Sequence, residues 1–332
     1  MKDLRDPRPD AERDRSLRAD VNARFLDSFR TLLASLSDAG IDVEQAVQKI
    51  NSADAARKLS GMWHVIYDRL LAEARNQDLG EVERILGCLS QLPDQTDQVR
   101  IVGWYLNTYP TALHELYYDA CDESFRKTYG VHFDGESNRP EHYDLLQSSI
   151  RRAIDKMAMI DPEIHGEFGE LVSDVMTFHS PTMNAATSLC ALGIIRVSQL
   201  REGQNWTRYL ENLVHEAAHH HLNYLWFVDP IVLNEDAGTY SSPLRREKRP
   251  LSGIFHAMFV LARTMRVIRA LQAHPDFDPA TETVASAYNN AGNSASFEKK
   301  FEDCWTVLAE HARLTELGTA LMANTREMAF GG

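Results

Sequence analysis

The stretch LVHEAAHHHLN, residues 213–223, places four histidines and one glutamate within seven residues. His215 and His219 are four positions apart, so on an α-helix their side chains lie one above the other on the same face. Two imidazoles in that arrangement can bind one metal ion, and the five residues from His215 fit the pattern H-E-x-x-H. The spacing therefore predicts a metal site on a helix, unless these histidines are only solvated or packed.

The two neighbouring histidines do not complete such a site. At about 100° per residue, His220 lies about 140° and His221 about 240° around a helix from His215. Neither can join His215 and His219 at one ion without leaving the helix. We expect His220 and His221 to lie beside the site or to face solvent.

A third ligand has to come from elsewhere in the chain. The longer zinc-protease pattern H-E-x-x-H-x-x-G-x-x-H needs glycine and histidine where this chain has Leu222 and Leu225. Another protease pattern takes a later glutamate, but Glu235 follows Asp-Pro in a loop and is expected to be solvated. His256 stands in an apolar helical segment. Spacing alone leaves it open whether His256 is a core histidine or the third ligand.

Two predicted helices carry these residues. The first covers about 206–227 and ends at Asp229-Pro230, because the residue before proline disfavours helical backbone. The second covers about 251–273, with Pro250 near its first turn. A loop rich in Asn, Asp, Gly, Ser and Pro joins them over about 229–250.

The rest of the chain is predicted to be helical, apart from one short region. The sequence pattern changes at 178–200, where turn residues are followed by short apolar runs. One of these runs, 193–197, is a candidate strand. We expect a mainly α, multi-helical fold with a small β element, since strands are too few for a double-stranded β-helix (cupin). The other predicted segments are a loose charged arm at 1–20 and helical stretches at about 21–92, 97–128, 146–177 and 294–328. A polar segment at 132–144 suggests a boundary between an N-terminal helical region, 21–140, and a metal-binding region, 141–332.

Composition narrows the functional classes. The chain has 332 residues and a formal net charge of -13, which argues against broad nucleic-acid binding but not against a peptide partner, preferably a basic one. It shows no signal peptide and no apolar run long enough for a membrane span. The four cysteines are far apart, so we expect reduced, mostly buried thiols in a cytoplasmic protein.

Three strings together carry a resemblance to a known family. LVHEAAHHHLN, DPIVLN and YSSPLRREKRPLSGIFHAMFVLAR resemble the HExxH-type peptide β-hydroxylases, a bacterial family associated with ribosomally made, post-translationally modified peptides (RiPPs). The motifs cover about residues 185–270, and the flanking helical regions are compatible with a full-length member. The string Y-S-S-P-x-R…R-P-x-x-G-x-x-H at this distance from H-E-x-x-H is far more specific than H-E-x-x-H alone.

The resemblance implies an enzyme that uses Fe(II), 2-oxoglutarate and O2 to hydroxylate a side-chain Cβ of a precursor peptide. The implied iron ligands are His215, His219 and His256, in place of the usual two histidines and one carboxylate of non-haem iron oxygenases. Such a site carries one more positive charge, which favours an anionic cosubstrate. Glu216 points about 100° away from His215 and is expected to lie beside the ligands without binding the metal.

The far carboxylate of 2-oxoglutarate needs a cation, best a guanidinium. Within the matching string the candidates are Arg245 and Arg249, either of which can also be an ordinary surface charge. We favour Arg249 because it leads directly into the helix of His256. The remaining candidates are Ser241 and Ser242 for hydrogen bonds to the cosubstrate or for the turn, Tyr240 for the pocket wall, and Arg196 for cosubstrate or peptide, while Arg246 and Lys248 are expected to be solvated.

Two other functions remain open from the sequence. In a zinc metallopeptidase, Glu216 would be the general base that acts on Zn(II)-bound water. In a non-catalytic helical binding protein, the metal would be structural or absent. The peptidase would cleave peptides without oxygen or 2-oxoglutarate, whereas the oxygenase would need both.

Overall fold

A computed structural model describes residues 3–92, 95, 97–103, 110–129, 140–178, 183–199, 205–236, 238–244, 247–280, 282, 284 and 295–331. The chain divides into two compact units, and neither is continuous in sequence. Unit 1 comprises residues 1–14, 149–168 and 200–332, and unit 2 comprises residues 15–148 and 169–199. The fold is mainly α with a small, open β-sheet, as the sequence predicted.

Unit 2 contains the sheet and a set of helices. Its helices are most of α1 (Ala11–Asp38), α2 (Glu44–Asn51), α3 (Met62–Asn76), α4 (Leu79–Ser90), α5 (Thr111–Tyr129), the first part of α6 (Pro140–Ile160) and the end of α7 (Pro162–Leu171). A short 3-10 helix, η1 (Leu189–Ala191), precedes the last strand. Apolar side chains from α1 to α5 form one continuous core with residues of the sheet, among them Met176, Phe178 and Ile194.

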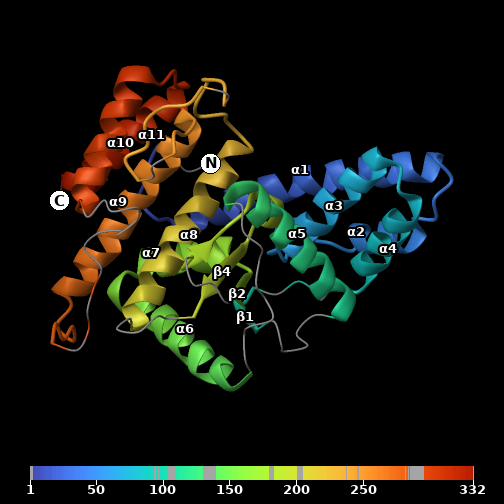
Figure 1. Ribbon diagram of the computed structural model, residues 1–332, viewed down its shortest axis with the longest axis horizontal. Coiled ribbons are helices and arrows are strands. Elements are labelled where there is room, and N and C mark those ends of the chain that lie inside the picture. The colour runs from blue at the N-terminus through green and yellow to red at the C-terminus, as the bar shows by residue number, and fades with distance from the viewer. Residues whose placement is uncertain are drawn as a thin grey trace. The chain divides into compact units, whose positions relative to one another are not determined.

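The sheet has four strands in the order β1 (Arg100–Gly103), β2 (Asp174–Phe178), β4 (Ile194–Ser198) and β3 (Ala185–Ala186). β1, β2 and β4 are parallel and lie side by side in Figure 1, whereas β3 is antiparallel to β4. Every residue of β2 and of β4 is buried, as expected for central strands covered on both faces. The strand predicted at 193–197 is therefore confirmed as β4.

A buried carboxylate joins the sheet to the start of α3. Asp174 at the beginning of β2 accepts hydrogen bonds from Arg100 at 2.8 and 3.2 Å, from Ser60 at 3.1 Å and from Ser173 at 2.8 Å. Because a buried carboxylate is costly unless it is paired and hydrogen-bonded, these donors stabilise its charged form. Gly61 donates its backbone N–H to Ser173 Oγ at 3.1 Å and so brings α3 against the sheet.

Unit 1 is built around two long helices, α8 (Trp206–Trp226) and α9 (Leu251–Ala273), which pack against each other. α10 (Phe297–His311) and α11 (Glu316–Phe330) both pack on α9, as Figure 1 shows in orange and red. Asn205 caps α8 by accepting a hydrogen bond from the backbone of Thr207 at 2.9 Å, and α9 begins directly after Pro250. The two helices predicted to carry the histidines are confirmed within a residue of the expected bounds.

Helix α9 is long and apolar enough to cross a membrane by length and composition alone. However, 78% of its most apolar window is buried inside the structure. The contacts with α8, α10 and α11 account for this burial, so α9 is the core helix of unit 1.

Two expectations about chain organisation were wrong. Residues from Ala11 onward belong to helix α1, so the charged N-terminal segment is not a loose arm as far as residue 20. Arg13 and Asp14 of this helix are buried and form an ion pair. The prediction assumed that charged residues are exposed, so it could not identify this pair. The chain passes from one unit to the other four times, within α1, α6 and α7 and after β4, and not at one point in 132–144. Most of that predicted boundary lies outside the described residues.

Two predicted helical stretches also contain strands. β1 lies in the stretch 97–128, and β2 lies at the end of the stretch 146–177. Both strands are short, and β2, which is buried throughout, lacks the alternation that distinguishes a strand from a helix. The cysteines are free: Cys88, Cys121 and Cys304 are buried and Cys190 is exposed.

Replacing Gly61 by alanine should destabilise unit 2. A Cβ atom there would lie 2.3 Å from Ile194 Cγ1 and 2.8 Å from the backbone oxygen of Leu192. We expect Gly61→Ala to lower the free energy of unfolding by about 1–3 kcal/mol, the usual cost of overpacking, in urea denaturation. Gly87→Ala is the matched control, because a Cβ on that α4 residue meets nothing within 4 Å. An equal effect of the two substitutions would contradict this packing.

Candidate metal centre

The structure brings together the three histidines singled out in the sequence. His215 and His219 lie one turn apart on α8, with ring centroids 5.0 Å from each other. His256 on α9 lies opposite, with its ring centroid 5.0 Å from that of His219. The Nδ1 atoms of His219 and His256 are 2.8 Å apart. The contact joins residues 37 positions apart and depends on the packing of α8 against α9.

The separation of these two nitrogens suits a shared metal ion. Two nitrogens at right angles, each about 2.1 Å from one ion, are about 3 Å apart. Without an ion, the same 2.8 Å contact is a hydrogen bond in which one neutral ring donates its N–H to the bare nitrogen of the other. The pair thus already has the spacing of neighbouring ligands.

His215 does not yet converge with this pair. The nitrogens of the three histidines do not all lie within 4.8 Å of one another. His215 is half-buried and stands edge-on to His219, with 67° between the ring planes. A change in the side-chain rotamer of His215 is therefore needed to complete a three-histidine set.

Both rings of the histidine pair are half-buried and have lowered pKa values. Desolvation, followed by the nearby His256, His215, His220 and Arg249, holds the pKa of His219 well below its ordinary value. Desolvation and the charge of Arg249 lower the pKa of His256 to about 3. Both rings are therefore neutral at neutral pH, and the ring that donates the hydrogen bond would have to move its proton from Nδ1 to Nε2 for both Nδ1 atoms to bind a metal ion.

Arg249 acts on both of these histidines through its charge. It is half-buried and immediately precedes Pro250, after which α9 begins. Its side chain runs along the first turn of α9, since Arg249 Cδ would lie 3.8 Å from a Cβ at Gly253. Its backbone exchanges two hydrogen bonds with Tyr240, at 2.8 and 2.9 Å, which closes the intervening loop. The residue preferred for cosubstrate binding thus lies beside the candidate ligands.

Trp226 was missed in the sequence. Its indole stacks on the ring of His256 with centroids 4.3 Å apart and an interplanar angle of 22°. Trp226 Nε1 donates to the backbone oxygen of Pro230 at 2.6 Å, which fixes the ring. Trp226 follows His219 by seven residues, so both share a helix face, and this spacing would have identified it.

The loop that follows α8 is tied down at several points. Ile231 has a φ of +54°, in the left-handed region that a β-branched residue rarely adopts. Asp229 Oδ1 accepts from the backbone of Ile231 and from Thr315 Oγ1, both at 2.7 Å. The structure therefore holds a strained conformation beside Trp226, as is typical of functional sites.

The other residues predicted to bind the cosubstrate or line the pocket differ in exposure and location. Ser241 is exposed and Ser242 is half-buried in the loop, while the Tyr240 ring lies 5.2 Å from that of His311. Arg245 and Arg246 lie outside the described residues, and Lys248 is exposed as expected. Arg196 belongs to β4 of unit 2, where it is buried and donates to Cys121 Sγ at 3.3 Å. Of these residues, the backbone of Tyr240 has the clearest connection to the site, through Arg249.

The remaining residues of the helical motif are more buried than expected. His220 and His221 are both 0% exposed, so the alternative that they face solvent was wrong. Glu216 is buried on α8, whereas Glu235 is exposed as predicted. After desolvation, the charge of Arg249 is the second cause of the lowered pKa of His256.

Comparison with protein-family models and with curated proteins gives no match. The function therefore has to be argued from the geometry of the site and from the motifs.

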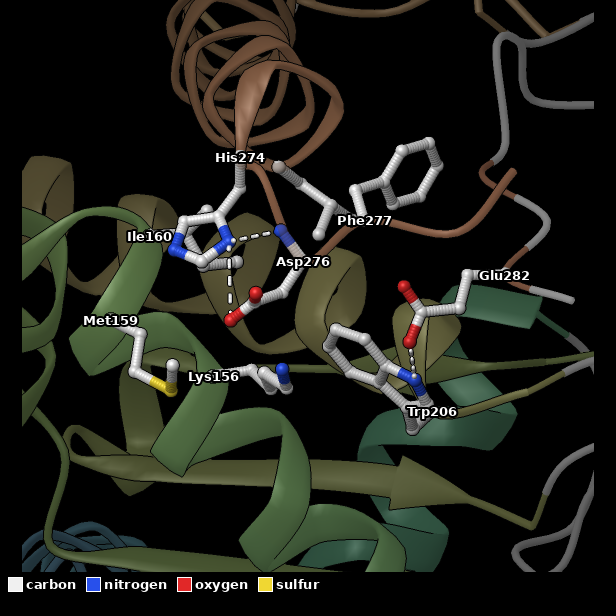
Figure 2. Close-up of a pocket in the computed structure, with 9 residues that line it drawn as sticks. Lys156, Met159, Ile160, Trp206, His274, Asp276, Phe277 and Glu282 are labelled. Carbon is white, nitrogen blue, oxygen red and sulfur yellow. Dashed lines mark hydrogen bonds and ion pairs between the residues drawn. The ribbon is translucent and has the colours of Figure 1, made fainter. Parts of the chain in front are cut away.

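A small pocket lies elsewhere in unit 1. Figure 2 shows it near the end of α9, with Trp206 donating to Glu282 at 3.2 Å and His274 beside Asp276. Its volume of about 10 Å³ is no larger than the space that one water molecule needs. Leu271 in its lining is 15 residues beyond His256 on α9, about 22 Å along the helix. This pocket is not part of the histidine site.

The histidine site predicts that the chain binds one divalent ion. We expect His219→Ala and His256→Ala to abolish binding, measured as metal content after dialysis. Because a ligand that binds only the folded state stabilises it, by about 2.7 kcal/mol at 100 times Kd, chelation should also lower the Tm of the wild type. His274→Ala, on a half-buried histidine near the other end of α9, is the control. Full metal content in His219→Ala would exclude this site.

Proposed function

We propose that this protein is an Fe(II)- and 2-oxoglutarate-dependent oxygenase that hydroxylates a side-chain Cβ of a ribosomally made precursor peptide. One observation supports the proposal beyond the motif. The side chain of Arg249 runs along the first turn of α9, the helix that carries His256. A cation at this place would attract an anion that binds together with the metal.

The charges around the site favour an anionic cosubstrate. Three neutral histidines would leave the two positive charges of Fe(II) uncompensated. The N-terminus of α9, which has no side-chain cap, adds positive potential next to Arg249. 2-Oxoglutarate carries two carboxylates at neutral pH, so its two negative charges would offset the charge of the metal ion.

Different residues would bind the metal and the cosubstrate. His215, His219 and His256 would hold the metal, and the guanidinium of Arg249 would bind the far carboxylate of 2-oxoglutarate with two parallel hydrogen bonds. Trp226 covers one face of the His256 ring and keeps water from it. Fixed ligands and a fixed anion site reduce the freedom of the reactants, which is how such sites accelerate reactions.

The metal and its cosubstrate supply the oxidising power when they are bound. In the overall reaction, one atom of O2 enters the C–H bond as a hydroxyl group and the other enters succinate, while 2-oxoglutarate loses CO2. The protein's part is to hold the peptide Cβ beside the metal and to exclude water. The peptide substrate itself is supported by the resemblance of the motif strings.

The runner-up is a zinc metallopeptidase with Glu216 as general base. It is supported by the H-E-x-x-H pattern and by the position of Glu216 next to His215. It is disfavoured because the third ligands of the known zinc-protease patterns are missing: the chain has Leu222 and Leu225 at the positions of the longer pattern, and Glu235 is exposed. A peptidase would also leave the specific string around Arg249 unexplained.

Mass spectrometry of a precursor peptide distinguishes the two functions. The purified protein is incubated with the precursor peptide encoded beside it, Fe(II), ascorbate, 2-oxoglutarate and air. We expect the peptide to gain the mass of one oxygen atom, with one succinate formed per hydroxylation. Omitting 2-oxoglutarate or oxygen should abolish the change, since both are consumed.

Glu216→Gln provides the matched control for this assay. It keeps the shape of the side chain but cannot act as a general base. Hydroxylation should continue in this variant, whereas a peptidase would lose its activity. Cleavage of the peptide by the wild type under anaerobic conditions would overturn the oxygenase proposal.

Arg249→Lys should weaken the binding of 2-oxoglutarate specifically. Lysine retains the charge but loses the two parallel hydrogen bonds, and hydrogen bonds to charged groups contribute about 1.5–3 kcal/mol. We expect the KM for 2-oxoglutarate to rise roughly 10- to 100-fold, with metal binding retained. Lys248→Ala, one position earlier and exposed, should leave this KM unchanged. An unchanged KM in Arg249→Lys would remove Arg249 from the cosubstrate site.

A further inference from the structure

A second group of buried polar side chains lies in unit 1 and joins α8 and α9, the helices of the histidine site, to α1 and α7. We call it the carboxylate–arginine cluster, and it consists of Arg13, Asp14, Glu167, His221 and Arg263. Arg263 donates from two nitrogens to the two oxygens of Glu167, both at 3.0 Å. Arg13 Nε donates to Asp14 Oδ1 at 3.2 Å. His221 Nδ1 lies 3.1 Å from Asp14 Oδ1 and 3.8 Å from Glu167 Oε2.

The cluster has the donor atoms of a metal site but not the charge of one. Asp14, Glu167 and His221 offer ligand atoms that all lie within 4.8 Å of one another. The two guanidinium groups already neutralise the two carboxylates, and both oxygens of Glu167 are occupied by Arg263. A divalent cation would leave two uncompensated charges in a group of side chains at most 3% exposed, which is very costly.

The cluster is also a poor source of stability. Asp14 Oδ2, Arg263 Nε and both ring nitrogens of His221 are buried and have no hydrogen-bond partner among the described residues. Each such group costs about 1–3 kcal/mol of desolvation free energy. Apolar side chains of similar volume often stabilise a protein more than a buried ion-pair group does. The burial of these five side chains is therefore better explained by a role in positioning neighbouring residues than by a contribution to stability.

His221 connects the cluster to the histidine site. It follows His219 by two residues, so the two side chains leave α8 in directions about 200° apart. The His221 ring stacks on Phe259 of α9, with centroids 5.5 Å apart and planes within 3°. Arg263 lies over the same phenylalanine ring, 5.1 Å from its centroid. α8 therefore contacts α9 on two flanks, through His219 with His256 and through His221 with Phe259.

This two-sided contact resists rotation of α8 about its own axis. Side-chain atoms lie about 5–6 Å from a helix axis, so a rotation of 10° moves them by about 1 Å. Because His219 and His221 lie on nearly opposite sides, any such rotation displaces both contacts with α9. Functional groups need to be held within about 0.5 Å of their working geometry, so a rotation of this size would separate the ligand pair.

We propose that the carboxylate–arginine cluster is a positioning device that fixes His221 and thereby the rotation of α8 that keeps His219 at ligand distance from His256. Arg263 anchors the cluster to α9, and Asp14 and Glu167 present carboxylate oxygens to His221. The inference rests on the metal site of the proposed function, but not on the oxygenase reaction. His221 is a positioning residue and does not bind the metal.

Anaerobic titration with Co(II), followed by visible absorption, tests this role. His221→Phe keeps the ring on Phe259 but removes the nitrogens that face the carboxylates. We expect a loss of Co(II) affinity of about 10- to 100-fold, as for other residues that orient metal ligands, together with a changed absorption band. His221→Gln, whose amide again places a polar nitrogen beside the carboxylates, should restore much of the affinity and the band.

His64→Phe is the matched control, because His64 is a buried histidine in unit 2 whose ring lies 4.1 Å from that of Phe25. It should bind Co(II) as the wild type does. Circular dichroism checks that each variant is folded. If His221→Phe does not fold, Asp14→Asn replaces it, because it removes the carboxylate charge nearest to His221 and should also weaken binding.

Three results would overturn the proposal, and they are distinguishable. Wild-type affinity and spectrum in a folded His221→Phe would remove the positioning role while leaving the metal site intact. Two Co(II) ions per wild-type chain, one of them lost in His221→Phe, would make the cluster itself a metal site. A wild type that binds no Co(II) would refute the histidine site, and the positioning role would fail with it.

Discussion

The 2.8 Å contact between His219 Nδ1 and His256 Nδ1 is the constraint around which unit 1 is arranged. Two neutral, desolvated rings attract each other only weakly, so they remain together because the helices that carry them are packed. Ala217 and Ala218 on α8 have small side chains, and Phe255 and Met258 on α9 are fully buried. The apolar packing of the helices stabilises unit 1, and this stability holds the polar groups of the histidine site in place.

Some features near this contact reduce stability. Ile231 has left-handed backbone, which costs about 1–3 kcal/mol, and His221 buries two nitrogens without hydrogen-bond partners among the described residues. Unit 2 has such groups as well, among them Asn22 Oδ1 and Trp63 Nε1, although its buried Asp174 is paired with several donors. In unit 1 the burial of α9 offsets part of these costs.

The sequence predicted the helices of the site better than the units of the fold. Strong apolar periodicity and the proline at each boundary located α8 and α9, and four-residue spacing paired His215 with His219. β2 was taken as helix because a strand buried on both faces has no alternating pattern. The pairing of His256 with His219 rested on resemblance, since 37 residues of separation carry no geometric information. The burial of His221 was not predictable, because it depends on Asp14 and Glu167 from distant parts of unit 1.

The proposed site divides between two kinds of structure. The proposed metal ligands stand on helices, and helices hold ligands more precisely than loops do. Arg249 stands instead at the end of a loop whose backbone is closed by pairing with Tyr240. In the proposed reaction a cosubstrate enters and its product leaves in each cycle, so a binding group on a backbone that can open at two hydrogen bonds suits that role. The same opening would disrupt a metal ligand, and the proposed ligand His256 lies beyond the loop, on the second turn of α9.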